Sequence, residues 1–235
     1  MCGRFAVDIA PEVLAETFGL QVVPTVVPRY NVAPTQQVAV VREDTDGGNR
    51  LDLLHWGLIP AWAKERTIAY KMINARSETL LEKPSFRQAY KYRRCVVPVS
   101  GFYEWRHEGK EKLPHYIRIR DGLPMLFAGL WESWKSPEGE VVESFTILTT
   151  AANKLLESIH ERMPVILHPD ECGRWLNRHL TDPTPLSVFF QPYPADLLEL
   201  WPVSPLVNTP KVDSCELIAP ICPQKEISTE ILRAQ

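Results

Sequence analysis

Residues 94–131 read RCVVPVSGFYEWRHEGKEKLPHYIRIRDGLPMLFAGLW, and this stretch decides the fold that the sequence predicts. Four β-rich segments follow one another in it, at 94–99, 102–106, 115–120 and 125–131. Within 115–120, apolar and basic residues alternate, as expected for a strand with one buried and one exposed face. The turns between the segments are short, which favours antiparallel pairing. The sequence therefore predicts an α+β protein built on antiparallel sheets.

The flanking sequence adds a hairpin and several helices. Segments 37–42 and 50–56 flank Asp46-Gly47-Gly48, which is a hairpin signal. Short helices are expected on the outside of the sheets, at 11–18, 84–92, 151–159 and 170–178. No repeat or linker interrupts the chain, so residues 1–235 are expected to form one domain with an irregular tail from Pro202.

Composition limits the classes of protein to which the chain can belong. Its 235 residues carry a net charge of −3, so nucleic acid can be attracted only by a local basic patch. The cysteines, at 2, 95, 172, 215 and 222, form no CxxC pair, which argues against disulfides and structural zinc. No signal peptide or membrane-spanning run is visible. We expect a cytoplasmic protein without metal or other cofactor.

The chain begins Met1-Cys2-Gly3. Methionine aminopeptidase removes Met1 when the second residue is small, and this would leave Cys2 with both an α-amine and a thiol. Both groups have a usable deprotonated fraction near neutral pH. The amine can condense with an aldehyde, and the thiol can then close a five-membered thiazolidine in a favourable intramolecular step. The alternative is a buried, inert cysteine.

Two titratable residues stand in sequence contexts that suit proton transfer. Glu104 lies between Tyr103 and Trp105 in a predicted strand, and an inward-facing carboxyl would be desolvated there. Alternatively, the aromatic residues are core and Glu104 faces water. His160 follows a predicted helix and can act as an acid or base, or simply cap that helix.

Asn74 and Arg76 alternate, so in an extended segment they share one face. Asn74 can hold a hydroxyl or carbonyl, and Arg76 can grip a phosphate. Alternatively, this is a turn beside a surface ion pair with Glu78.

Basic and aromatic residues are interleaved at 83–94, a composition typical of a groove for single-stranded nucleic acid. Arg87 is the representative of this cluster in our predicted DNA-binding set. The segment 56–62 carries Trp56 and Trp62 around a Gly and a Pro, which could form a base-stacking platform. Alternatively, the basic cluster at 83–94 is the solvated face of a helix, and the tryptophans of 56–62 are packed core.

Together these motifs resemble a known family, the SOS-response-associated peptidase (SRAP) family, whose members shield abasic sites in single-stranded DNA. The resemblance covers about residues 2–205, whereas 206–235 are uninformative. It rests on the motifs MCGRF (1–5), PRYNVAPT (28–35), WGLIP (56–60), NARSET (74–79), RC (94–95), GFYEW (101–105), FTILTT (145–150) and HERMP (160–164).

The resemblance implies a pseudo-barrel of antiparallel sheets flanked by short helices. It implies that Cys2 is the nucleophile, and that Asn74, Glu104 and His160 complete the catalytic set. It also implies that Arg4, Arg76 and Arg162 contact DNA phosphate or the abasic sugar; we add Arg87 and Trp56 as predicted DNA contacts.

The implied activity is the capture of an abasic site. His160 would open the sugar ring, Asn74 would hold the open sugar, and Glu104 would handle the proton lost as an imine forms at Cys2. Closure of the thiazolidine would leave a covalent DNA–protein crosslink. The imine also permits β-elimination, so weak abasic-site lyase activity is expected.

Other classes of protein remain open from the sequence. The chain could be a cysteine peptidase with Cys2 as thiol nucleophile and Met1 as its one secure substrate. Amidotransferases with an N-terminal nucleophile also begin Met-Cys-Gly but need a partner domain, for which 235 residues leave no room. A single-strand binding module would not need Cys2. The expected partner is single-stranded DNA with abasic sites, bound by a monomer at the bacterial nucleoid.

Overall fold

The computed structural model describes residues 2–22 and 25–221, and it confirms the predicted α+β class. The strands are β1 (Phe5–Val7), β2 (Arg29–Val32), β3 (Gln37–Glu43), β4 (Asn49–Trp56), β5 (Asn74–Arg76), β6 (Arg94–Val99), β7 (Gly101–Glu108), β8 (Glu111–Ile119), β9 (Met125–Lys135), β10 (Val141–Ala151), β11 (Arg162–Pro164), β12 (Ile166–Leu167) and β13 (Leu198–Pro202). The α-helices are α1 (Pro11–Phe18), α2 (Pro84–Tyr92) and α3 (Cys172–Leu176). The 3₁₀ turns are η1 (Arg66–Lys71), η2 (Ser77–Thr79), η3 (Pro169–Glu171), η4 (Thr184–Phe190), η5 (Ala195–Leu197), η6 (Pro205–Asn208) and η7 (Cys215–Ile218).

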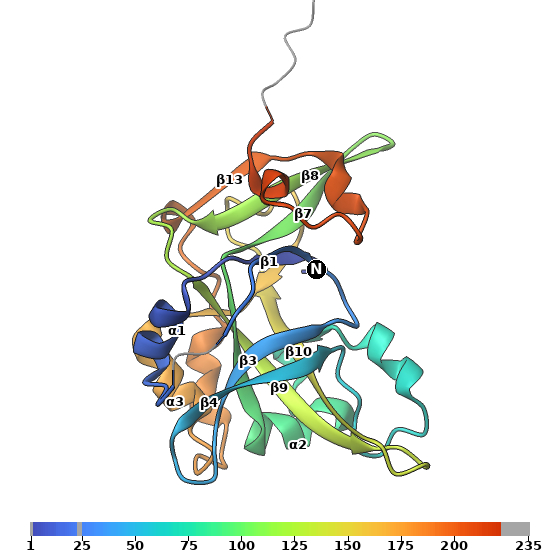
Figure 1. Cartoon of the computed structure of the whole chain (residues 1–235), viewed down its shortest axis with the longest axis vertical. Coiled ribbons are helices and arrows are strands. Elements are labelled where there is room, and N and C mark those ends of the chain that lie inside the picture. The colour runs from blue at the N-terminus through green and yellow to red at the C-terminus, as the bar shows by residue number, and fades with distance from the viewer. Residues whose placement is uncertain (1, 23–24, 222–235) are drawn as a thin grey trace, which may run out of the picture.

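The larger sheet closes on itself. Its strand order is β11-β10-β4-β3-β6-β9-β12, and β9 also pairs with β10, so that β10, β4, β3, β6 and β9 form a ring. The smaller sheet has the order β13-β8-β7-β1-β2 and lies above this barrel in Figure 1. The predicted pseudo-barrel is thereby confirmed.

Not every strand pair is antiparallel. β10 pairs in parallel with β4, with Phe145 opposite Trp56, and in parallel with β5, with Ile147 opposite Asn74. The predicted antiparallel sheets are confirmed, and the parallel pairs of β10 are a feature that the sequence did not indicate. Parallel pairs need long crossover connections, and these leave no local turn signal in the sequence.

The N-terminal strand β1 joins the two sheets. It pairs with β2 and β7 in the smaller sheet, while the Phe5 ring packs against Trp56 of β4, with ring centroids 4.6 Å apart. Phe5 and Trp56 are fully buried, and burying a side chain of this size contributes about 2–3 kcal/mol. This packing fixes the start of the chain against the barrel wall.

β8 can lie this close to the start of β7 because residue 101 is glycine. Gly101 pairs with Ala6, and a Cβ at position 101 would lie 2.5 Å from the Ile117 carbonyl oxygen and 2.5 Å from the Tyr116 hydroxyl. Any side chain there would push the strands apart.

Two helices were predicted correctly and two were not. α1, closed by Gly19 with φ 60°, and α2 match their predicted bounds. Residues 154–159 form turns instead of a helix; the Asn153 side chain caps their start by accepting from the Leu155 and Leu156 amides, and it donates to the Tyr193 carbonyl. The helix expected at 170–178 is shortened to α3, preceded by η3.

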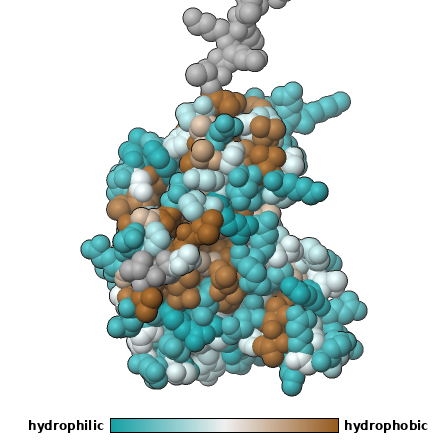
Figure 2. Space-filling view, viewed as in Figure 1, coloured by the Kyte–Doolittle hydropathy of each residue, from teal (hydrophilic) through white to brown (hydrophobic). Residues whose placement is uncertain are grey.

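One face of the molecule carries apolar surface near its middle (Figure 2). An apolar groove of about 290 Å³ is lined mainly by residues of β2, β3 and β4 and includes Val27 and Leu53, which are 71% and 67% exposed. The groove lies apart from the predicted site residues, none of which lines it.

Candidate functional site

The strand register places the start of the chain beside Glu104. Phe5 lies opposite Phe102, and the Tyr103 amide donates to the Arg4 carbonyl at 2.9 Å. Continued by one residue, this register puts Gly3 opposite Glu104, with Cys2 next to it. Both Cys2 and Glu104 are buried, at 0% and 5% exposure, so Glu104 faces inward as the functional interpretation requires.

Asn74 holds the backbone of Cys2. Its Nδ2 donates to the Cys2 carbonyl oxygen at 2.8 Å. Among the described residues, the buried Oδ1 of Asn74 has no hydrogen-bond partner, which leaves an acceptor at the site. β5 itself is held by Trp56, whose Nε1 donates to the Ile73 carbonyl at 3.0 Å.

The environment of Cys2 keeps its thiol protonated. Burial raises the thiol pKa well above its ordinary value, and the nearby Glu104 carboxylate raises it further. The Sγ atom lies 4.0 Å from the Arg4 carbonyl oxygen, a weak contact. A buried thiol beside a carboxylate is a poor thiolate nucleophile.

His160 lies at the end of the barrel wall that carries Asn74. β10 is flanked by β5 and β11, and its Thr149 pairs with Arg76 on one side and Pro164 on the other. His160 comes just before β11, and its Nδ1 accepts from the Arg162 amide at 2.9 Å. Within the described part of the chain no helix ends directly before His160, so the helix-cap alternative does not apply.

Two of the predicted DNA-binding arginines are engaged in internal contacts. The Arg162 guanidinium makes two bonds to Glu78, at 2.5 and 2.9 Å, and a third to the Thr149 carbonyl at 2.6 Å. Glu78 thus pairs with Arg162 and not with Arg76. Through Nη1, Arg4 donates to Asn31 at 2.7 Å and to the Val207 carbonyl at 2.8 Å. Sequence reasoning gave Asn31 no role, although it lies in the PRYNVAPT motif.

Arg76 and Arg87 are exposed, and therefore accessible to a phosphate backbone. Arg76 shares its strand with Asn74, as the alternation predicted. It is the basic side chain placed nearest to that residue along the chain.

Trp56 does not fit its predicted stacking role. It is fully buried between Phe5 and Phe145, so its ring offers no surface to a base. Trp62, in the same motif region, is 60% exposed and lines a hollow of about 600 Å³ with Lys64 and Lys71. Of the two tryptophans in this segment, Trp62 is the one whose ring is exposed.

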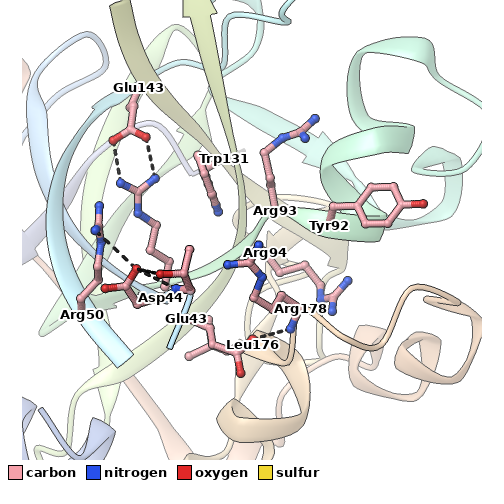
Figure 3. Close-up of a pocket in the computed structure, with 12 residues that line it drawn as sticks. Glu43, Asp44, Arg50, Tyr92, Arg93, Arg94, Trp131, Glu143, Leu176 and Arg178 are labelled. Carbon is pink, nitrogen blue, oxygen red and sulfur yellow. Dashed lines mark hydrogen bonds and ion pairs between the residues drawn. The ribbon is translucent and has the colours of Figure 1, made fainter. Parts of the chain in front are cut away.

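The basic cluster at 83–94 does not form a groove over its whole length. Arg94 is buried and donates to backbone carbonyls, including those of Trp175 and Tyr90, while Arg93 pairs with Glu132 at 2.7 Å. Figure 3 shows the pocket of about 420 Å³ beside them. Acidic partners balance the arginines in and around this pocket: Arg42 with Asp52 and Glu143, Arg50 with Asp44 and Asp52, and Arg93 with Glu132.

Metal-ligating side chains do not gather in the described part of the chain. Within residues 2–22 and 25–221, no group of three or more His, Cys, Asp or Glu side chains could hold a metal ion. Among the helices of these same residues, none is long and apolar enough to cross a membrane.

Known proteins resemble the chain over nearly its whole length. "Abasic site processing protein YoqW" of Bacillus subtilis is 47% identical over 222 residues, which cover 93% of this chain and 99% of the relative. "Abasic site processing protein YedK" of Escherichia coli is 32% identical over 228 residues, covering 94% and 100%. A crystal structure of a Bacteroides thetaiotaomicron protein superposes with a TM-score of 0.84 at 27% identity, covering 94% and 100%. The pattern of the family described as SOS response associated peptidase (SRAP) matches residues 1–210, and the chain belongs to this family.

Proposed function

We propose that this protein captures abasic sites in single-stranded DNA as a covalent thiazolidine at Cys2, once Met1 has been removed. The observation that carries the proposal is the placement of Cys2, whose carbonyl is held by Asn74 and whose thiol lies beside Glu104. The names of the relatives support the class of substrate.

The first bond is formed by the α-amine of Cys2. Its nitrogen adds to the aldehyde carbon of the opened sugar, and the resulting carbinolamine loses water to give a protonated imine. The Glu104 carboxylate takes a proton from the Cys2 ammonium, which frees the amine, and then gives that proton to the departing hydroxyl.

The second bond closes the ring. The sulfur of Cys2 adds to the imine carbon, and the thiol proton returns to the Glu104 carboxylate. Overall, aldehyde and cysteine give a thiazolidine and one water, and Glu104 returns to its starting state when it releases the thiol proton to solvent. This order suits a thiol that is protonated in the resting chain.

The cysteine-peptidase alternative is less well supported by the same site. A thiol nucleophile of that class works as a thiolate, which a neighbouring base or a lowered pKa provides. Here burial and Glu104 act in the opposite direction on the Cys2 thiol. Removal of Met1 by the chain itself therefore remains a minor proposal, as does weak lyase activity from the imine.

The proposed path for the DNA strand runs over exposed basic and aromatic side chains, beginning at β5. Arg76 supplies charge for a phosphate, and Trp62 offers a ring on which a base can stack. Arg87, on the exposed face of α2, extends the basic surface. We propose that the protein acts as a monomer in the cytoplasm, at the nucleoid.

The test is intact mass after incubation with a single-stranded abasic oligonucleotide. The expected product has the mass of processed protein plus oligonucleotide minus one water. The variant Cys2→Ala should lose this heat-stable product but keep an imine that borohydride traps. The control Cys215→Ala removes an exposed cysteine and should leave the product unchanged.

A second variant separates the aminothiol from the thiol. One extra residue ahead of Cys2 blocks its amine while keeping the thiol, and should abolish both the stable adduct and the imine. If protein that retains Met1 forms the heat-stable adduct, the chemistry is that of the thiol alone and the proposal is wrong.

A further inference from the structure

The internal contacts of Arg4 use only one nitrogen of its guanidinium. Nη1 carries two hydrogens, and it donates to Oδ1 of Asn31 at 2.7 Å and to the Val207 carbonyl oxygen at 2.8 Å. Both hydrogens of Nη1 are therefore engaged. In the part of the chain that the structure describes, the buried Nε has no hydrogen-bond partner, and no carboxylate acts on the charge of Arg4.

The edge of the guanidinium that carries Nε and Nη2 is suited to an anion. Two parallel N–H groups on one edge bind two oxygens of the same phosphate at once. Arg4 is half-buried, and burial without an acidic partner lowers its pKa, because the charge loses water and gains no compensation. A phosphate at this edge would supply that compensation.

Asn31 is held in one orientation by backbone carbonyl groups. It is 1% exposed, and its Nδ2 donates to the Val212 carbonyl at 2.6 Å and to the Thr209 carbonyl at 3.1 Å. Carbonyls only accept and a guanidinium only donates, so a flipped amide would lose its bonds at both ends. Oδ1 therefore stays directed at Arg4.

The strand that carries Asn31 is fixed on both sides. The Tyr103 hydroxyl donates to the Tyr30 carbonyl at 2.6 Å, and the Tyr30 amide donates to Asp213 at 2.5 Å. On β1, Phe5 lies opposite Val32. The two acceptors of Nη1 thus belong to a rigid frame.

We infer that Asn31 is a positioning residue for DNA binding, which acts by directing the Nε–Nη2 edge of Arg4 at one backbone phosphate beside the captured site. Asn31 itself does not touch DNA. Together with the Val207 carbonyl it takes both hydrogens of Nη1, and so it decides which edge remains for the phosphate. This role rests on the proposed function, in which Arg4 lies two residues from the reacting Cys2. An arginine fixed in advance loses less entropy when it binds.

The test measures binding of an intact single strand by the processed protein, so that it does not depend on crosslinking. Fluorescence anisotropy gives the Kd between about 50 and 200 mM salt. Arg4→Gln should bind about tenfold more weakly, as expected when one hydrogen bond to a charged group is lost. The slope of log K against log salt should be shallower by about 0.7, the value for one phosphate contact on a single strand. Asn31→Ala should also weaken binding, by at least about threefold, and flatten this slope, although it removes no charge.

The double variant separates positioning from a merely structural role. If Asn31 acts through Arg4, adding Asn31→Ala to the Arg4→Gln protein should change its affinity by less than about twofold. A further loss as large as the one in the parent would overturn the inference. An Arg4→Gln protein with the affinity and salt slope of the parent would overturn it as well.

Asn208→Ala is the matched control. Asn208 is exposed, and its Oδ1 accepts from Trp105 Nε1 at 2.8 Å, so the variant loosens the same C-terminal segment without touching Arg4. It should keep the affinity and salt slope of the parent. Equal weakening by Asn208→Ala and Asn31→Ala would show that the segment matters and not the orientation of Arg4, and the inference would be wrong.

Thermal unfolding shows whether each variant is folded. Asn31→Ser keeps a short hydroxyl donor for a neighbouring carbonyl but does not reach Arg4, and it should show the same loss of binding. It replaces Asn31→Ala if that variant does not fold.

Crosslinking separates this inference from the proposed function. With an abasic strand, Asn31→Ala should raise the DNA concentration needed for half the maximal rate and leave the rate at saturation close to that of the parent. A loss confined to the saturated rate would show that Asn31 acts on the chemistry and would overturn the inference. If the processed parent forms no crosslink, the proposed function fails, whereas binding of the intact strand still reports on Asn31 and Arg4.

Discussion

Replacing Trp56 with phenylalanine should lower stability and slow crosslinking without weakening DNA binding. The indole Nε1–H donates to the Ile73 carbonyl, which also accepts from the Ile147 amide at 3.1 Å. Because that carbonyl keeps one donor, losing the indole bond costs only about 1 kcal/mol. The smaller ring leaves a partial cavity against Phe5, worth about 1–2 kcal/mol more.

The total of about 2–3 kcal/mol is below the usual stability of a domain, about 5–15 kcal/mol, so the variant should fold. Crosslinking should slow because Trp56 supports both Phe5, three residues from Cys2, and Ile73, next to Asn74. Urea unfolding measures the loss of stability, and the crosslinking rate at saturating DNA measures the effect on the reaction.

Trp62→Ala is the matched comparison. Trp62 is 60% exposed, so its loss should change the free energy of unfolding by less than about 0.5 kcal/mol. It should weaken binding of an intact single strand by about 1–3 kcal/mol, or about 5- to 150-fold, as measured by fluorescence anisotropy. The reasoning is refuted if Trp56→Phe weakens binding at unchanged stability, or if Trp62→Ala binds like the parent.

Three further predictions concern substrate, catalysis and pH. Crosslinking should be faster on abasic single strands than inside a long duplex and should slow with added salt; equal rates on both would contradict the proposed strand path. Glu104→Ala should impair trapping of a simple open aldehyde by up to about 10²–10⁴-fold, while His160→Ala should mainly slow trapping of the closed sugar; equal losses on both substrates would remove this division. Burial raises the pKa of the Cys2 and Cys95 thiols above their ordinary value of 9.0, so above that pH the native chain binds more protons than the unfolded one. The free energy of unfolding measured in urea should therefore be flat near neutrality and fall from about pH 9 upward. A flat profile to about pH 10.5 would contradict this.

Elements with local signals were predictable from the sequence. α1 begins at Pro11 and ends before Gly19. Proline suits the first helical turn, and glycine readily adopts the left-handed conformation that follows the last turn. Gly47, with φ 81°, makes the turn between β3 and β4 possible in the same way.

Features set by distant partners were not predictable. Asn153 donates to the Tyr193 carbonyl, 40 residues away, a contact that no local pattern indicates. The parallel pairing of β10 with β4, which completes the ring, and with β5 depends on register across long connections. A single sequence carries no signal for these contacts.

In the candidate site, too, local signals were predictable and distant contacts were not. Inward placement of Glu104 was one of two open interpretations, and only the register of β1 on β7 decides between them. Arg162 and Arg4 looked like phosphate-binding residues because their charge was visible, while their internal partners, Glu78 and Asn31, lie 84 and 27 residues away in the sequence. The burial of Trp56 was likewise hidden, because tryptophan serves cores and stacking surfaces alike.

The contact between Arg4 and the Val207 carbonyl has a consequence for biosynthesis. These residues are 203 positions apart, and Asn31 ties the same carbonyl to the first strands. A ribosome releases the chain from its N-terminus, so Arg4 emerges first and its partner Val207 almost last. Met1 can be removed early, whereas the segment that carries Cys2 and Arg4 gains its full support only when synthesis is nearly complete. The order of translation therefore delays assembly of the candidate site until the rest of the protein surrounds it.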